Sequence, residues 1–327
     1  MAFQRRQFLH LATGAVALCV LSVGIFDNGA WPQPARTIKV VVPFPPGGGT
    51  DILARILGEQ ISRTQGLTIL IENRPGAGAV IGTEAVSRAA PDGNTLLVAA
   101  PAFVISPRLR KLNYDPLTSF EPICQLTSTP TVLLVNSASP YRTLSELLDV
   151  ARARPGSLTM GGIPGSPLHL GFEMLKRTAN VDMTFVPYAG GAPAVSALLG
   201  NHVTSVFLPY SGLEEQLKAG RLRALASASR TRSEALPDVP TVAESGYKDF
   251  ETDFWNGLLA PAKTQKETVS QLAGWFTAAM LVPEVEAKLV TQNLYPVGTC
   301  GADFGAVLRK KYVEYGRIIA EANIKAE

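Results

Sequence analysis

Histidine and cysteine are scarce in this chain, whose 327 residues include three of each. No H-E-x-x-H, G-x-S-x-G or C-x-x-C motif occurs, so the sequence lacks the common patterns of zinc proteases, serine hydrolases and dithiol oxidoreductases. The glycine-rich segment GGGTD also lacks the lysine with which a Walker loop contacts phosphate. These absences leave few candidate groups for catalysis.

Charge is also sparse, and neither sign dominates. Charged residues make up 17% of the chain, and the formal net charge is +3. So mild a charge, without a run of Lys or Arg, argues against nucleic acid as a partner. Hydrophobic residues make up 46% of the chain, which fits a globular protein long enough for two domains. We expect a monomer that binds no nucleic acid.

Long apolar runs are absent beyond the N-terminus, where Gly14–Phe26 is too short to span a bilayer comfortably. Arg5 and Arg6 precede this run, as in a twin-arginine export signal. We therefore predict cleavage of residues 1–30 or 1–35 and a periplasmic location. An uncleaved anchor and a disordered basic start are the alternatives.

Only two cysteines, Cys124 and Cys300, lie beyond the predicted signal. An oxidising compartment would permit a disulfide between them. Free cysteines often behave as small buried apolar residues, and two separate buried thiols are the interpretation we favour.

Apolar runs rich in Val, Ile and Leu alternate with segments of helical spacing almost throughout the chain. This alternation predicts an α/β fold with mainly parallel sheets flanked by helices. The expected strands are too many for one small sheet and suit two. They are Thr37–Pro43, Thr68–Glu72, Thr95–Ala99, Val132–Asn136, Leu158–Gly161, Met183–Val186, Val203–Leu208, Arg223–Ala228 and Phe254–Ala260. The segment Pro296–Thr299 is expected to be a surface loop.

Glycine-rich turns connect the first two expected strands to helices, within residues 38–57 and 67–86. Such a turn exposes N–H groups at a helix N-terminus, and the helix dipole there favours an anion. The Ser166 turn and the segment Pro187–Gly191 offer two further helix N-termini in the second half of the chain. Two lobes whose turns face each other could close on a small anionic ligand.

A nucleotide cofactor is the main alternative, because Gly76, Gly78 and Gly82 have spacing similar to some dinucleotide-binding turns. Such sites also have an acidic residue at the end of the next strand. Here that strand ends at Val98-Ala99, without an acid. We therefore expect no cofactor, while a secreted α/β enzyme, possibly binding a nucleotide, stays open as the second interpretation.

Two titratable residues near the turns have both functional and structural interpretations. His169 could face a ligand beside the Ser166 turn, or it could be a packed or surface residue. Asp51 could be a catalytic carboxylate, or it could cap the first helix and pair with Arg55 one turn later. We favour the structural role for Asp51, because no neighbouring base is evident in the sequence.

Six ordered motifs cover essentially the whole chain beyond the signal. The sequence resembles the Bug-type receptors, the extracytoplasmic solute-binding proteins of tripartite tricarboxylate transporters. The motifs are PFPPGGGTDILAR, ENRPGAGAVIGTEAV, PDGNTLL, GSPLHL, VPYAGGAPAVSALLG and LPDVPTVAESG.

The resemblance implies a two-lobed periplasmic-binding-protein fold of type II, with a ligand cleft between lobes that are joined by crossover strands. It places one lobe at residues 36–130 plus 250–327 and the other at 131–249, after an export signal at 1–35. It also implies a non-enzymatic receptor without cofactor or metal. Such a receptor binds a small carboxylate and acts transiently with membrane transport subunits or a sensor.

By the same resemblance, the ligand is held largely by backbone groups and ordered waters of the first lobe. Glycine suits this role because it lets a ligand approach the backbone closely. The implied ligand-binding residues are Phe44, Gly48, Gly49, Thr50, Asp51, Ala77, Gly78, Ala79, Ser166, His169, Tyr188, Gly190 and Gly191.

Three positions depart from the family pattern. Ala79 stands where many relatives have glycine, and Asn94 replaces a common tyrosine. Pro209-Tyr210 follows a strand after which relatives often have an acidic residue. Without that carboxylate to neutralise an ammonium group, di- or tricarboxylates or aromatic acids are favoured over amino acids. The backbone turns alone do not identify which acid is bound.

Overall fold

The computed structural model describes residues 36–164, 166–210, 213–233, 236–248, 250–252 and 254–324. From Thr37 onward the chain forms one compact unit. The predicted export signal, residues 1–35, lies outside the described residues. No helix in the described ranges is long and apolar enough to cross a membrane.

The strands form two sheets. The first has six strands in the order β11-β4-β10-β3-β1-β2, and the second has five in the order β7-β6-β8-β5-β9. Strands of the first sheet are β1 (Thr37–Val42), β2 (Thr68–Asn73), β3 (Thr95–Ala99), β4 (Phe120–Thr129), β10 (Phe254–Pro261) and β11 (Tyr295–Cys300). Strands of the second are β5 (Thr131–Asn136), β6 (Thr159–Gly162), β7 (Thr184–Pro187), β8 (Ser205–Pro209) and β9 (Leu222–Ser227).

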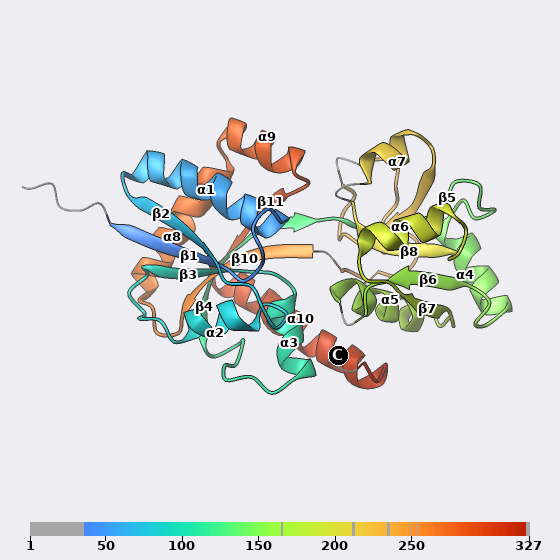
Figure 1. Cartoon of the computed structure of the whole chain (residues 1–327), viewed down its shortest axis with the longest axis horizontal. Helices are drawn as coiled ribbons and strands as arrows, with labels where there is room; N and C mark the ends of the chain where they lie inside the picture. The colour runs from blue at the N-terminus through green and yellow to red at the C-terminus, as the bar shows by residue number, and fades with distance from the viewer. Residues whose placement is uncertain are drawn as a thin grey trace, which may run out of the picture. The chain divides into compact units, whose positions relative to one another are not determined.

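Helices cover both faces of the first sheet (Figure 1). Alternate residues of β1 point to opposite faces: Ile38 and Val40 join the core beneath α1, α8 and α9, and Val41 joins the other core. That second core lies beneath α2, α3 and α10. The helix bounds are α1 Gly49–Gln65, α2 Val80–Ser87, α3 Ala102–Leu109, α8 Lys266–Met280, α9 Pro283–Thr291 and α10 Gly301–Glu321.

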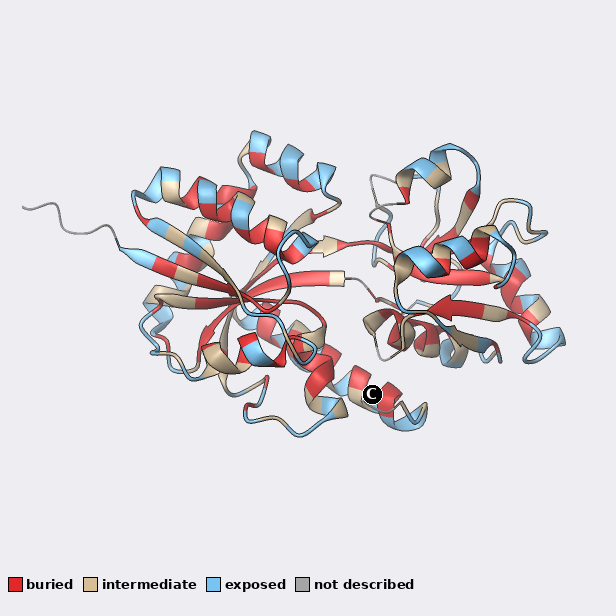
Figure 2. Cartoon of the chain, in the orientation of Figure 1, coloured by how far each residue is buried: buried red, intermediate tan, exposed pale blue. Residues whose placement is uncertain are grey.

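The second sheet is covered in the same way. Helices α4 and α5 pack on one face, and α6 and α7 on the other. The inner strands of both sheets are mostly buried, whereas the edge strands β2, β7 and β11 and the outer helix faces are more exposed (Figure 2). The bounds are α4 Leu144–Ala153, α5 Pro167–Thr178, α6 Gly191–Leu199 and α7 Glu214–Lys218.

The chain passes between the two sheets twice. Strand β4 of the first sheet continues through Pro130 into β5 of the second, and residues 228–253 return the chain from β9 to β10. Helix α10 also contacts both sides, since it packs on α3 and reaches α5, where Arg177 Nη2 lies 2.5 Å from Glu321 Oε2. These segments define where the two sheets are connected.

All nine expected strands are present within two residues of their predicted bounds. Two strands, β4 and β11, were not predicted, and the assignment of Pro296–Thr299 to a surface loop was wrong. Polar residues interrupt the apolar pattern of β4. Pro296 and Gly298 are residues typical of turns, so the sequence of β11 predicted a loop. The register between β11 and β4 shifts at Pro296/Thr299, and such an irregularity can accommodate these residues in a strand.

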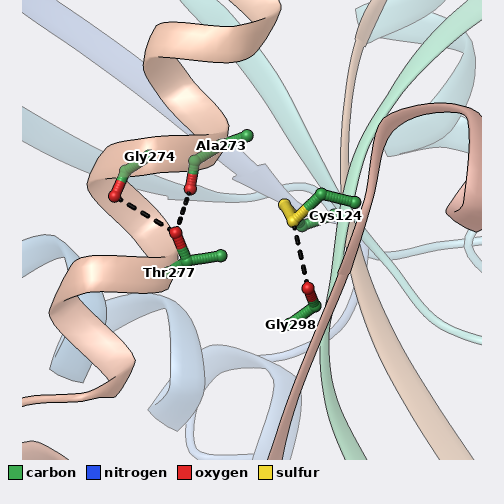
Figure 3. The surroundings of a disulfide bond; sticks show 6 residues. Cys124, Ala273, Gly274, Thr277 and Gly298 are labelled. Atoms are coloured by element: carbon green, nitrogen blue, oxygen red, sulfur yellow. Dashed lines mark hydrogen bonds between the residues drawn. A yellow bond between two sulfur atoms is a disulfide. The ribbon is translucent and has the colours of Figure 1, made fainter.

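The expectation of two separate buried thiols was also wrong, because Cys124 and Cys300 form a disulfide (Figure 3). The antiparallel pairing of β11 with β4 places the two cysteines directly opposite each other. The Cys300 Sγ also lies 3.3 Å from the Gly298 carbonyl oxygen. Sequence reasoning missed the bond because it missed both strands that bring the cysteines together.

Candidate functional site

The first turn of the candidate site connects β1 to α1. Gly47 has a φ of +85°, which glycine adopts without strain, and Gly48 is the N-cap residue of α1. No side chain caps this helix. Its first backbone N–H groups therefore have no side-chain acceptor and point outward from the start of the helix. A helix N-terminus of this kind attracts anions through its N–H groups and its dipole.

Asp51 holds the first turn in place. Its Oδ2 accepts hydrogen bonds from the Gly47 N–H and the Arg55 Nε, both at 2.9 Å. Its Oδ1 accepts from Asn73 Nδ2 at 2.9 Å, and the same amide donates to the Phe44 carbonyl at 3.1 Å. The predicted pairing of Asp51 with Arg55 is therefore confirmed, and the network also connects the turn to the end of β2.

The Asp51 side chain is buried, and its charge is stabilised by these donors. Burial by itself raises the pKa of the carboxyl, but hydrogen bonds from Arg55, the Gly47 N–H and Asn73 outweigh it. The pKa therefore lies below its ordinary value, and the group is ionised at neutral pH. Since both oxygens accept from protein donors, the structure gives Asp51 a positioning role, and direct ligand contact stays a prediction.

Thr50 is also engaged within the protein. Its hydroxyl donates to Asn256 Oδ1 at 2.8 Å, and Asn256 Nδ2 donates to the Thr127 hydroxyl at 3.2 Å. All three side chains are buried. Because a hydroxyl has one proton to donate, the Thr50 hydroxyl is committed to Asn256 as a donor, and contact of Thr50 with a ligand stays a prediction.

The second turn connects β2 to α2 by an unusual backbone. Four successive residues have positive φ: Gly76 at 131°, Ala77 at 49°, Gly78 at 64° and Ala79 at 75°. Alanine rarely adopts such values because its Cβ approaches the following carbonyl. Ala79 is the N-cap residue of α2, and no side chain caps that helix either. The Ser106 hydroxyl donates to the Gly78 carbonyl at 3.2 Å.

Both turns lie at the same edge of the first sheet. Strands β1 and β2 are parallel, and their last residues, Val42 and Asn73, are paired. The Arg74 N–H donates to the Val42 carbonyl at 2.9 Å. At Gly82 of α2, an added Cβ would come within 2.9 Å of Pro43 Cβ, so the second turn packs closely on the first. Two helix N-termini thus follow neighbouring strand ends.

The second sheet has a comparable pair of turns, which follow β6 and β7. These strands are parallel, with Gly162 paired to Pro187, and the Tyr188 N–H donates to the Gly162 carbonyl at 2.7 Å. Helix α6 begins at Gly191 after the N-cap Gly190 and has no side-chain cap. Gly191 also borders a cavity of about 370 Å³ that includes Leu208 and Pro209.

Helix α5 is capped by its own side chain. As the sequence predicted, Ser166 is the N-cap and Pro167 the first helical residue. The Ser166 hydroxyl accepts from the His169 N–H at 3.2 Å and donates to the Ile163 carbonyl at 2.7 Å. The Ser166 hydroxyl could therefore only accept a hydrogen bond from a ligand, because its proton is already donated to the Ile163 carbonyl.

His169 packs against an aromatic ring. Its imidazole stacks on Phe185 with ring centres 3.9 Å apart, and its Nε2 lies 3.9 Å from Glu173 Oε1. Burial lowers the pKa of the imidazole, Glu173 opposes this effect and Lys176 adds to it. The lowered pKa favours the neutral form at pH 7, and the stacking fits the packed interpretation. Contact of His169 with a ligand remains a prediction.

Sequence reasoning missed Asn73 and Asn256, which connect the turns to β2 and β10. Asn73 could have been considered because it follows the predicted strand directly, but its bond to Asp51 spans 22 residues. The bond between Thr50 and Asn256 spans 206 residues and follows only from the sheet order. No group of three or more metal-binding side chains occurs within the described ranges.

Two α/β sheets joined by crossing segments, with helix N-termini at the strand ends, are the architecture of the periplasmic-binding-protein fold. The solved structure of the periplasmic binding protein BugD has the same fold. It matches with a TM-score of 0.69 and 31% identity, covering 90% of this chain and 100% of that one. The predicted two-lobed α/β class is therefore confirmed. The expectation of mainly parallel sheets was wrong, because among the described strands four pairings are parallel and five are antiparallel. Each antiparallel pairing involves β4, β5 or β10, the strands next to the crossings between the sheets.

The chain belongs to the tripartite tricarboxylate transporter family receptors, whose family model matches residues 53–324. It is 35% identical over 268 residues to BugT of Bordetella pertussis, covering 81% of this chain and 82% of BugT. The structure of Rpa4515 from R. palustris, solved with adipate, has a TM-score of 0.72 and 31% identity. That match covers 90% of this chain and 99% of Rpa4515. The resemblance inferred from the six motifs is confirmed.

Proposed function

We propose that this protein is an exported, non-enzymatic receptor that captures a small carboxylate for a membrane transporter or a sensor. One observation carries the proposal: α1 and α2 begin at the ends of paired parallel strands, and no side chain caps either helix. Two such N-termini present adjacent N–H groups to an anion. Family membership and the adipate in the related Rpa4515 structure support a carboxylate as that anion.

Backbone groups are proposed to carry most of the recognition. Neither Gly47–Gly49 nor Gly76–Gly78 contains Lys or Arg, and the nearest arginines are paired, Arg55 with Asp51 and Arg74 with Glu72. The first turn would contribute backbone N–H groups around Gly48 and Gly49, and the second would contribute those around Gly78. Burial from solvent on closure would strengthen these interactions.

The second sheet would complete the site. We propose lobes at residues 36–130 plus 250–327 and at 131–249, with the ligand held between them. The implied contacts from the second lobe are Ser166, His169, Tyr188, Gly190 and Gly191. Of these, Gly190 and Gly191 begin the uncapped α6 and offer backbone donors, while the hydroxyl of Ser166 offers an acceptor.

Export is part of the same proposal. Residues 1–35 would be a cleaved twin-arginine-like signal, and the mature protein would act as a periplasmic monomer that contacts transport subunits transiently. A disulfide fits an oxidising compartment of this kind. Intact-mass measurement of periplasmic protein should give a chain lacking 30 or 35 residues, and a full-length mass there would contradict the signal.

A thermal-shift screen of carboxylic acids tests the receptor function. Ligand that binds only the native state adds about 2.7 kcal/mol of stability at 100 times its Kd. At least one di- or tricarboxylate should therefore raise Tm in a saturable way, and the matching amides of the same carbon skeleton should not. The active acid should be recovered unchanged after incubation with the protein. Turnover of that acid, or equal shifts with acid and amide, would reject the proposal.

A further inference from the structure

One exposed face of helix α10 carries arginine but no acidic residue. Six exposed residues of this helix recur every three or four positions, so they form a single stripe along it. They are Ala302, Ala306, Arg309, Val313, Arg317 and Ala320. Val313, in the middle of the stripe, is 64% exposed. None of the thirteen candidate ligand-binding residues belongs to this helix, so the stripe has no part in the candidate site.

Helix α3 packs against α10 (Figure 1), and its C-terminal end lies beside the stripe. Arg108 Nε donates to the Tyr312 carbonyl at 3.2 Å, and the guanidinium carbon lies 3.6 Å from the centre of the Tyr312 ring. At Gly316, an added Cβ would come within 2.6 Å of Arg108 Nε. Because Tyr312 and Gly316 directly precede Val313 and Arg317, Arg108 lies next to the stripe.

Two more cations follow Arg108 in the sequence. Arg110 and Lys111 come directly after α3 and are exposed, as is Arg108 itself. With Arg309 and Arg317 they make a set of five cationic side chains, which we call the basic face. None of the five forms an ion pair with a carboxylate in the part of the chain that the structure describes. Their charge is therefore available to a partner outside the chain.

The acidic residues of α10 follow the side of the helix that is turned away from α3. Asp303, Glu314 and Glu321 are separated by 11 and 7 positions, which places them along one flank. Glu321 is already paired with Arg177 of α5. Burial raises the pKa of the Glu314 carboxyl against the opposing effect of nearby cations, Arg317 among them. Apart from that attraction, the acidic flank leaves the basic face uncompensated.

We propose that the basic face binds an anionic phospholipid surface. Clustered Arg and Lys side chains are attracted to anionic headgroups over roughly one Debye length, about 10 Å at 0.1 M salt. The outer side of a helix is convex, and long cationic side chains suit a diffuse negative surface better than a shaped partner. Val313 would contact the headgroup layer at the centre of the face. The inference goes beyond the proposed receptor function, because it concerns where the protein is held rather than which solute it captures.

Cosedimentation with lipid vesicles tests the proposal. The chain from Arg36 onward is used, because it forms one compact unit from Thr37 and lacks the apolar N-terminal run. It should bind saturably to vesicles of equal parts phosphatidylcholine and phosphatidylglycerol, and raising the sodium chloride concentration should weaken this binding. Vesicles of phosphatidylcholine alone should not retain it. No carboxylate solute is present, so the result is independent of the proposed receptor function.

Paired variants test the basic face itself. Arg110→Gln with Lys111→Gln, and Arg309→Gln with Arg317→Gln, should each weaken vesicle binding by at least about tenfold. Arg142→Gln with Arg154→Gln is the control, since it removes the same charge from exposed positions beside α4 and should leave binding unchanged. Circular dichroism checks that each variant is folded.

Three results would overturn the proposal. They are equal binding to neutral and anionic vesicles, wild-type binding by both variants of the basic face, and an equal loss in the control. Binding to polyglutamate without binding to anionic vesicles would also overturn it, and would assign the basic face to an acidic protein instead.

Discussion

The two turns of the first sheet present similar helix N-termini by different means. Side chains hold the α1 turn: Asp51 accepts from Gly47, Arg55 and Asn73, and Thr50 donates to Asn256. The α2 turn depends on backbone conformation, with positive φ throughout residues 76–79. One turn is therefore specified by distant partners and the other by local geometry.

This difference predicts different vulnerabilities. A turn held by a buried carboxylate should respond strongly to loss of that group and to acid. A turn held by positive φ should respond to the presence or absence of a Cβ. Five tests of this contrast follow, starting with the change expected to have the largest effect.

Asp51→Ala should destabilise the protein by about 2–4 kcal/mol, because it leaves three donors without their charged acceptor. Urea unfolding of the purified protein measures the loss. Asp149→Ala is a matched control, since Asp149 is exposed and pairs with Arg152 on the surface of α4. The control should change stability by less than about 0.5 kcal/mol. Equal effects of the two variants would show that the α1 turn does not depend on its carboxylate.

The same carboxylate should make stability sensitive to acid. Its pKa is lower in the folded protein than the ordinary value of about 3.9, so its contribution is complete above that value and is lost as pH falls through the folded pKa. Below about pH 4, wild-type protein should therefore lose more unfolding free energy than Asp51→Asn. Unfolding titrations of both proteins between pH 7 and 2 provide the comparison. If the unfolding free energies of the two proteins fell equally with pH, the lowered pKa of Asp51 would be contradicted.

Gly78→Val should weaken carboxylate binding at least tenfold, about 1.4 kcal/mol. An added Cβ at Gly78 meets no protein atom closer than the Ser106 Oγ at 3.8 Å, so the fold can hold the side chain. The branched side chain would stand where a ligand must approach, and φ of +64° would strain it. Calorimetric titration with the acid found by thermal shift measures the loss, and circular dichroism checks folding.

Thr50→Val is the comparison for Gly78→Val. It keeps the side-chain shape and removes the hydroxyl that donates to Asn256, so it should cost about 0.5–1.5 kcal/mol of stability. Its effect on affinity should be smaller than that of Gly78→Val. Wild-type affinity in Gly78→Val, together with abolished binding in Arg55→Met, would show that a side-chain cation holds the carboxylate.

Ala79→Gly should stabilise the protein by about 0.5–1 kcal/mol, because glycine relieves the positive φ at the N-cap of α2. The gain is limited by the loss of a buried methyl group. Ala85→Gly, within the same helix, is the matched control and should be destabilising by a similar amount. Thermal unfolding measures whether each variant raises or lowers Tm relative to the wild-type protein. Destabilisation by both would argue that the alanine at 79 is not strained.

Local sequence patterns were sufficient for the turns and for most strands. The runs before Gly47 and Gly76 predicted β1 and β2, and Ser166-Pro167 predicted the start of α5. Features that depend on pairing between distant segments were missed, including β4 with its polar residues and β11 with Pro296 and Gly298. The same holds for the bond from Thr50 to Asn256, whose partners meet only once the sheet order is set.

The disulfide has a consequence for the connectivity of the whole molecule. Cys124 and Cys300 are separated by 176 positions, and every strand of the second sheet lies between them. The disulfide therefore closes a covalent ring of residues 124–300, from which the N-terminal and C-terminal segments of the chain extend. Hydrolysis of one peptide bond anywhere between the cysteines opens the ring but releases no fragment, so the nicked protein gains only the mass of one water until the disulfide is reduced. Both crossings between the sheets belong to that ring.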